Sequence, residues 1–109
     1  MPIDLDAHLT RQVRDILRDH VPECEVWVFG SRVDGAAKRF SDLDLAIVST
    51  TELPVRRLAL LASAFEESDL PIKVDLVDLR SASPTFRQRI AAHHAVIFQP
   101  VEPRQPEPA

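Results

Sequence analysis

The sequence is poor in several residue types, and each shortage narrows what the protein can be. Its 109 residues contain one cysteine, Cys24, so no disulfide can form within the chain, which fits a reducing cytoplasm. The most apolar stretch, residues 58–65, is far too short to span a bilayer. The N-terminus has no basic segment followed by an apolar run, as a signal peptide would. We therefore expect a cytoplasmic protein with no membrane association.

Excess positive charge is also lacking. The chain has 13 Lys and Arg residues and 17 Asp and Glu residues, which gives a formal net charge of −4 at pH 7. Nonspecific binding to nucleic acid depends on excess positive charge facing the phosphates. We therefore expect no direct binding to DNA or RNA. The length supports one domain with a modest core.

The pattern of apolar residues predicts strands that alternate with helices. Strands are predicted at 26–29, 43–48, 72–77 and 95–98. A first helix is predicted from Asp4 or Asp6 to about His20, and a second over about 32–39 with Ser31 as its cap. A third helix is predicted to begin at Pro54. A fourth is predicted to begin at Ser83-Pro84, with Phe86 and Ile90 pointing inward. This order predicts an α/β or α+β fold, a small mixed sheet flanked by helices. The connection 30–43 is short for a parallel crossover, so an antiparallel pairing is open there.

The last ten residues, 100–109, differ in composition from the rest of the chain. Four of them are proline, so no core can form there. We expect a domain over residues 1–99 followed by a flexible, proline-rich tail over residues 100–109.

Glycine is scarce, and both glycines lie within six residues of each other, at Gly30 and Gly35. Gly30 ends an apolar strand and permits close backbone approach, while Ser31 adds a hydroxyl where backbone amides favour phosphate. Alone, this turn is a weak signal and could be a simple strand-to-helix turn. Ten residues after Ser31 come Asp42 and Asp44, which point to one face of the next strand. Two such carboxylates repel each other unless a cation such as Mg²⁺ lies between them, although an Asp pair alone could be a solvated strand end.

A third acid is needed if two metal ions are to be held for phosphoryl transfer. Asp75 is the best choice, because it lies in an apolar run where an unpartnered acid is unfavourable. A plain ion pair with Lys73 on the same face is the alternative. Asp78 ends the same strand on the opposite face and is expected to be surface decoration.

These residues form one recognisable motif. The segment 28–47, with Gly30-Ser31, ten residues and then Asp42-Leu43-Asp44, resembles the signature of the minimal nucleotidyltransferases of the DNA polymerase beta superfamily. Arg32, Gly35 and Ser41 also match its common form, and the resemblance extends from about residue 26 to residue 98. It implies the polymerase-beta-like nucleotidyltransferase fold.

The resemblance also implies roles for the matching residues. Asp42 and Asp44 would bind two Mg²⁺ ions, and Asp75 would complete the catalytic and metal site and help to activate the acceptor hydroxyl. The triphosphate of ATP would be held by Gly30, Ser31 and Arg32, although Arg32 could instead pair with an acid such as Asp34. Two positions depart from the family pattern: Asp34 makes the local charge less favourable to phosphate, and His93-His94 replaces an acidic-glycine turn. Two adjacent histidines at a helix end do not face one metal, so His94 is expected to serve the turn.

Small nucleotidyltransferases of this kind often act as antitoxins. The resemblance implies a Mg-dependent protein adenylyltransferase that transfers AMP from ATP to a tyrosine of a helical HEPN-domain ribonuclease toxin, with which it would form a hetero-oligomer. The chain contains no tyrosine, so such an acceptor must lie in another protein. Two alternatives remain: an antitoxin that acts by binding alone, and nucleotidyl transfer to a small hydroxylated molecule.

Overall fold

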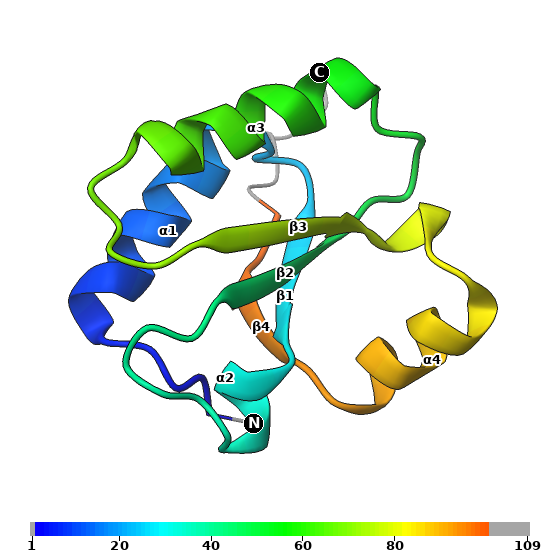
Figure 1. Cartoon of the computed structure of the whole chain (residues 1–109). Coiled ribbons are helices and arrows are strands. Elements are labelled where there is room, and N and C mark those ends of the chain that lie inside the picture. The colour runs from blue at the N-terminus through cyan, green and yellow to red at the C-terminus, as the bar shows by residue number, and fades with distance from the viewer. Residues whose placement is uncertain (1, 101–109) are drawn as a thin grey trace, which may run out of the picture.

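The computed structural model describes residues 2–100, so the predicted proline-rich tail lies almost wholly outside the described residues and the predicted domain boundary stays a prediction. Its centre is a four-stranded mixed sheet in the order β3-β2-β1-β4 (Figure 1). The strands are β1 (Glu25–Phe29), β2 (Leu43–Val48), β3 (Val74–Asp78) and β4 (Ala95–Phe98). β1 pairs antiparallel with β2 and with β4, while β2 and β3 run parallel. The antiparallel pairing that the short connection 30–43 left open is therefore present.

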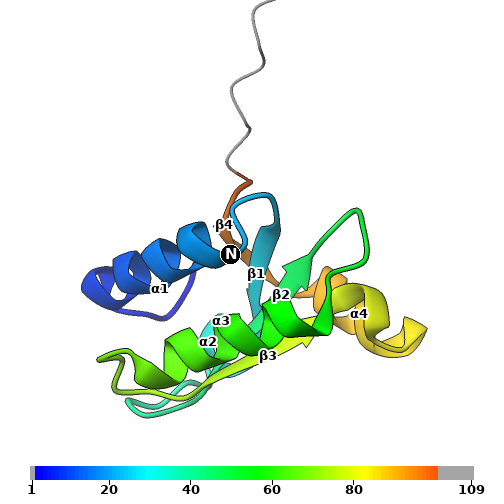
Figure 2. The same ribbon diagram turned by 90° about the horizontal axis from the view of Figure 1, so that it is seen from above.

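Helices lie on both sides of this sheet (Figures 1 and 2). α1 (Ala7–His20) and α3 (Val55–Glu67) pack against each other and cover one face. α2 (Ser31–Asp34) directly follows β1, and α4 (Pro84–Ala92) lies at the other side, after a short 3-10 turn (Leu79–Ser81). None of the helices within residues 2–100 is both long and apolar enough to cross a membrane.

The core lies between the sheet and the pair α1 and α3. Alternate residues of β1 and β2 point into it and are fully buried: Val26, Val28, Leu43, Leu45 and Ile47. They meet Val13 and Leu17 of α1 and Leu61 and Phe65 of α3. Burying each large apolar side chain contributes roughly 1.5–3 kcal/mol. Because strand residues alternate, this buried set forces the intervening residues of both strands to the opposite face.

Most helix starts follow the local chemistry of the sequence. The Asp6 carboxylate accepts a hydrogen bond from the His8 amide and so caps α1. The Ser83 hydroxyl accepts a hydrogen bond from the Phe86 amide ahead of Pro84, as the cap-then-proline pattern predicts. Pro54 occupies the cap position of α3, so the helix begins at Val55, one residue later than predicted.

Three predictions about these elements are corrected by the structure. The helix predicted over 32–39 spans only Ser31–Asp34, because Gly35 ends it in the left-handed conformation with φ of 79°. β3 begins two residues later than predicted, at Val74. On α4, Ile90 is buried as predicted, but Phe86 is 37% exposed and rests edge-on against Phe29 with ring centroids 5.8 Å apart.

An ion pair joins α3 to the segment between α1 and β1. The guanidinium of Arg57 donates hydrogen bonds to both carboxylate oxygens of Glu23 and, over 2.9 Å, to the carbonyl oxygen of His20. The Arg57 hydrogen bond lowers the pKa of Glu23 below its ordinary value. The pair therefore links α3 to the end of α1 and to the segment before β1.

Candidate active site

Two carboxylates of the predicted motif lie at the start of β2. Asp42 directly precedes the strand and is exposed, while Asp44 is its second residue and is partly buried. Leu43 and Leu45, which flank Asp44 in sequence, are fully buried in the core. Strand alternation therefore places Asp44 on the sheet face opposite α1 and α3.

The third predicted acid is brought directly beside the second. Asp44 and Asp75 are register partners in the parallel pair β2–β3, although 30 residues separate them in sequence. Register partners in neighbouring strands project to the same face of a sheet. Burial raises the pKa of Asp44 above its ordinary value, and the charges of Asp75 and then Asp42 raise it further. The fold thus gathers negative charge at one point of the sheet.

Asp75 itself is less buried than the sequence suggests. β3 is an edge strand whose residues are all partly exposed, so Asp75 does not lie inside an apolar interior. The Lys73 ammonium lies 3.5 Å from its carboxylate, with side-chain exposures of 72% and 42%. The ion pair that the sequence left open is therefore present. An exposed pair of this kind contributes little energy, so it leaves Asp75 free to meet a ligand.

Gly30 explains how the turn after β1 can lie against the acids. Its backbone has φ of 77° and ψ of −149°, a conformation essentially restricted to glycine. A Cβ atom at this position would lie 2.5 Å from Oδ2 of Asp44. The missing side chain therefore leaves the space that Asp44 occupies. Ser31, predicted as the cap of the next helix, is instead its first residue, and Gly30 occupies the cap position.

Arg32 is directed away from this face and into the protein. It is 6% exposed. Its guanidinium donates hydrogen bonds to the carbonyl oxygens of Ser41 (2.8 Å), Arg39 (3.3 Å) and Asp4 (2.8 Å). These bonds order the loop that leads into Asp42. The phosphate-binding role predicted for Arg32 gains no support from this geometry and stays a prediction.

The three residues that depart from the family pattern all make contacts within the protein. Nε2 of His93 lies 2.7 Å from the Asp34 carboxylate, so Asp34 pairs with His93 and not with Arg32, which was the sequence-based alternative. The His94 ring stacks on Trp27 with centroids 3.8 Å apart, and its Nδ1 lies 2.9 Å from the carbonyl oxygen of Ala91. His94 therefore serves the turn, as expected.

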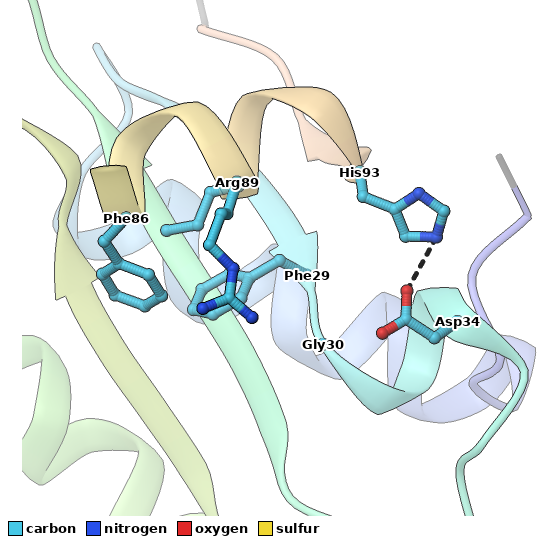
Figure 3. A pocket seen from close by; sticks show the side chains of 7 residues that line it. Phe29, Gly30, Asp34, Phe86, Arg89 and His93 are labelled. Carbon is cyan, nitrogen blue, oxygen red and sulfur yellow. Dashed lines mark ion pairs between the residues drawn. The ribbon is translucent and has the colours of Figure 1, made fainter. Parts of the chain in front are cut away.

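A hollow missed by sequence reasoning adjoins Gly30. It has a volume of about 290 Å³ and lies between the end of β1, α2 and α4 (Figure 3). Phe29 and Phe86 supply apolar walls, and Arg89 supplies a positive charge. Arg89 cannot be told from the nearby Arg87 by sequence, because only the orientation of α4 decides which of the two faces the hollow.

The number and spacing of the carboxylates determine whether the site can hold a metal ion. Within residues 2–100, no three His, Cys, Asp or Glu side chains stand close enough together to form a metal cage by themselves. Mg²⁺ is usually held by only one or two carboxylates together with substrate phosphates, and it prefers hard oxygen ligands. The concentration of negative charge that raises the pKa of Asp44 is what such a cation would offset. The residues present therefore fit Mg²⁺ bound together with a phosphate substrate.

Comparison with known proteins places this geometry in a family. The family model described as Polymerase beta, Nucleotidyltransferase matches residues 11–102. The chain belongs to this nucleotidyltransferase family. The MntA protein of Haemophilus influenzae, named a probable protein adenylyltransferase, is 45% identical over 95 residues, which are 87% of this chain and 83% of that protein. The protein adenylyltransferase MntA of Shewanella oneidensis is 39% identical over 80 residues, 69% of this chain and 54% of its own length.

Solved structures of nucleotidyltransferases in complexes show the same fold. A toxin-antitoxin complex with AMP-PNP contains a chain that superposes with a TM-score of 0.69 at 32% identity, covering 81% of this chain and 71% of that chain. A complex of the tri-AMPylated Shewanella oneidensis HEPN toxin with its MNT antitoxin gives a TM-score of 0.55 at 28% identity, covering 81% and 67%. The polymerase-beta-like nucleotidyltransferase fold expected from the sequence is confirmed, and so is the family.

Proposed function

We propose that this nucleotidyltransferase is a Mg-dependent protein adenylyltransferase and the antitoxin of a HEPN toxin. In this role it transfers AMP from ATP to a tyrosine hydroxyl of the toxin and so blocks RNA cleavage. The observation that carries the proposal is the pairing of Asp44 with Asp75 in register, with the turn at Gly30 packed against them. The likeness to the two MntA proteins supports adenylyl transfer as the reaction.

The residues of the donor site would have different functions in this reaction. Asp42 and Asp44 would hold Mg²⁺, while Gly30 and Ser31 border the place where the triphosphate would lie. When bound, Mg²⁺ supplies positive charge that orients the triphosphate and offsets its negative charge. In such reactions the protein contributes mainly positioning and electrostatic stabilisation. The clustered but only partly buried carboxylates suit this role, because they remain open to a ligand from the solvent side.

The proposed reaction forms one bond and breaks one. The tyrosine oxygen attacks the α-phosphorus of ATP, and the bond from that phosphorus to the bridging oxygen of the β-phosphate breaks. Pyrophosphate leaves with the electron pair. Asp75 accepts the hydroxyl proton, a role that its partial exposure on the edge strand β3 allows.

The acceptor must come from outside the chain, which contains no tyrosine. The solved complex of a tri-AMPylated HEPN toxin with its MNT antitoxin shows a relative together with such an acceptor. The AMP-PNP bound in the first toxin-antitoxin complex supports ATP as the donor. We therefore propose a HEPN-domain protein as the partner of this chain, in a hetero-oligomer.

The test is to mix the purified chain with ATP, Mg²⁺ and the HEPN-domain protein proposed as its partner. Mass spectrometry should show the partner heavier by one or more AMP units, and the double variant D42N/D44N should leave it unmodified. An unmodified partner that the wild-type chain nevertheless neutralises would show an antitoxin that acts by binding alone. Resistance to an aminoglycoside without any toxin would indicate a small-molecule acceptor.

A further inference from the structure

The hollow beside Gly30 contains one positively charged arginine side chain, that of Arg89. Arg89 extends from α4 into this hollow, towards the end of β1 (Figure 3). Over the described part of the chain, residues 2–100, its guanidinium makes no hydrogen bond and no ion pair. The only acid that lines the same hollow, Asp34, is engaged with His93 over 2.7 Å. The positive charge of Arg89 is therefore available to a ligand.

The hollow adjoins the acidic site at one residue, Gly30. Gly30 lines the hollow, and its Cα approaches the Asp44 carboxylate so closely that a Cβ atom would collide with it. A nucleotide held at the acids and at the turn would therefore extend part of its phosphate chain along Gly30 into this space. Phosphates in that position would meet Arg89.

The electrostatics of the site create a need for such a cation. The three acids concentrate negative charge, and a triphosphate adds more. Arg32, the cation suggested by the sequence, is buried and bound to backbone carbonyl oxygens. A guanidinium binds phosphate oxygens with two parallel hydrogen bonds and stays protonated at all physiological pH values. Charge that develops on a departing phosphate group is stabilised best by a cation already in place.

We propose that Arg89 binds the β- and γ-phosphates of the donor nucleotide and stabilises pyrophosphate as it leaves. This inference rests on the proposed function, because it assigns a residue to the same donor site. When the bond between the α-phosphorus and the bridging oxygen breaks, the electron pair moves to the pyrophosphate, and Arg89 offsets that charge without exchanging a proton. AMP, which lacks these two phosphates, does not reach Arg89.

The test compares nucleotide binding by wild type, R89A, R89K and R87A, using calorimetry with ATP, pyrophosphate and AMP in the presence of Mg²⁺. Arg87 is a matched control, since it is an exposed arginine of the same helix that borders a different hollow, with Val48 and Leu79. We expect R89A to weaken ATP and pyrophosphate binding about ten- to a hundredfold, the range for a lost hydrogen bond to a charged group. AMP binding should not change, R89K should recover part of the loss, and R87A should bind all three ligands as wild type does.

Several results would overturn the inference. Equal ATP affinities of R89A and wild type would do so, and so would an equal loss of AMP binding, which would indicate a structural role. A loss in R87A as large as that in R89A would indicate a general effect of charge. If the wild-type chain transfers AMP while R89A binds ATP normally, only the role of Arg89 is wrong. If the wild-type chain binds no ATP, the proposed function fails as well.

Discussion

Replacing Asp44 by Asn should make the metal-free protein more stable and, at the same time, inactive. Asp44 lies in register with Asp75, and both burial and the neighbouring charges raise its pKa. Like charges on directly opposed strand residues destabilise a sheet by about 0.2–1 kcal/mol. Removing one of them should therefore raise the free energy of unfolding by about 0.5–1 kcal/mol, or about 2–6 °C in Tm for a domain of this size.

The assay is thermal and urea unfolding at pH 7, with EDTA and then with Mg²⁺. Asp78→Asn is the control, because Asp78 ends β3, the strand that pairs with β2, and its carboxylate caps the following turn by accepting hydrogen bonds from Arg80 and Ser81. D78N should lose about 0.5–1 kcal/mol, since it weakens a cap. Mg²⁺ should stabilise wild type and D78N but not D44N. A D44N variant less stable than wild type in EDTA, or stabilised equally by Mg²⁺, would refute the reasoning.

The pH dependence of the stability of D44N tests the raised pKa of Asp44 independently. Because folding raises the pKa of Asp44, the folded state holds its proton more tightly than the unfolded state does. The stability that this proton brings is present at low pH and is lost as pH rises above the ordinary value of 3.8 through the raised value. The stability gap between D44N and wild type should therefore widen over this range in the absence of metal. A gap that is constant with pH would contradict the assignment.

Three further predictions concern residues that shape the site and the fold. Gly30→Ala should destabilise the protein by at least about 2 kcal/mol and abolish nucleotide binding, whereas Gly35→Ala, with the same sign of φ but no atom within 4 Å of the added Cβ, should lose only about 1 kcal/mol in urea unfolding. Equal losses would show that contact with Asp44 is unimportant. Arg32→Ala should lose about 2–4 kcal/mol by leaving partly buried carbonyl oxygens without their donor, measured by thermal unfolding, and an unchanged Tm would contradict its structural role. Arg57→Ala should remove stability that is present above the ordinary pKa of Glu23 and lost as pH falls through its lowered value, so the two Tm curves should converge in acid.

Much of the fold follows from local sequence signals. The strands 43–48 and 95–98 have the predicted bounds because both are short apolar runs, interrupted only by Asp44 in the first. The caps at Asp6 and Ser83 follow from side-chain chemistry within three residues. The helix predicted over 32–39 stops at Asp34, because Gly35 takes the left-handed conformation that ends a helix. A sequence pattern does not show whether the helix continues past Gly35. That also depends on the hydrogen bonds that Arg32 makes with the following loop.

Some features of the site follow from local sequence, and others depend on contacts between distant segments. The position of Asp44 on the face opposite α1 and α3 was predictable from strand alternation. The register between Asp44 and Asp75 was not, because it depends on the parallel pairing of strands that are distant in sequence. The exposure of Asp75 was misjudged because strand order decides that β3 is an edge. Arg89 was missed because its role depends on where α4 packs, and no local pattern encodes that.

The most direct test of the account is intact-mass measurement of the proposed HEPN partner after incubation with this chain, ATP and Mg²⁺. The account predicts a mass increase of whole AMP units on a tyrosine, lost without Mg²⁺ and lost in D42N/D44N. A partner that keeps its original mass while its ribonuclease activity is blocked, equally by wild type and by D42N/D44N, would contradict it.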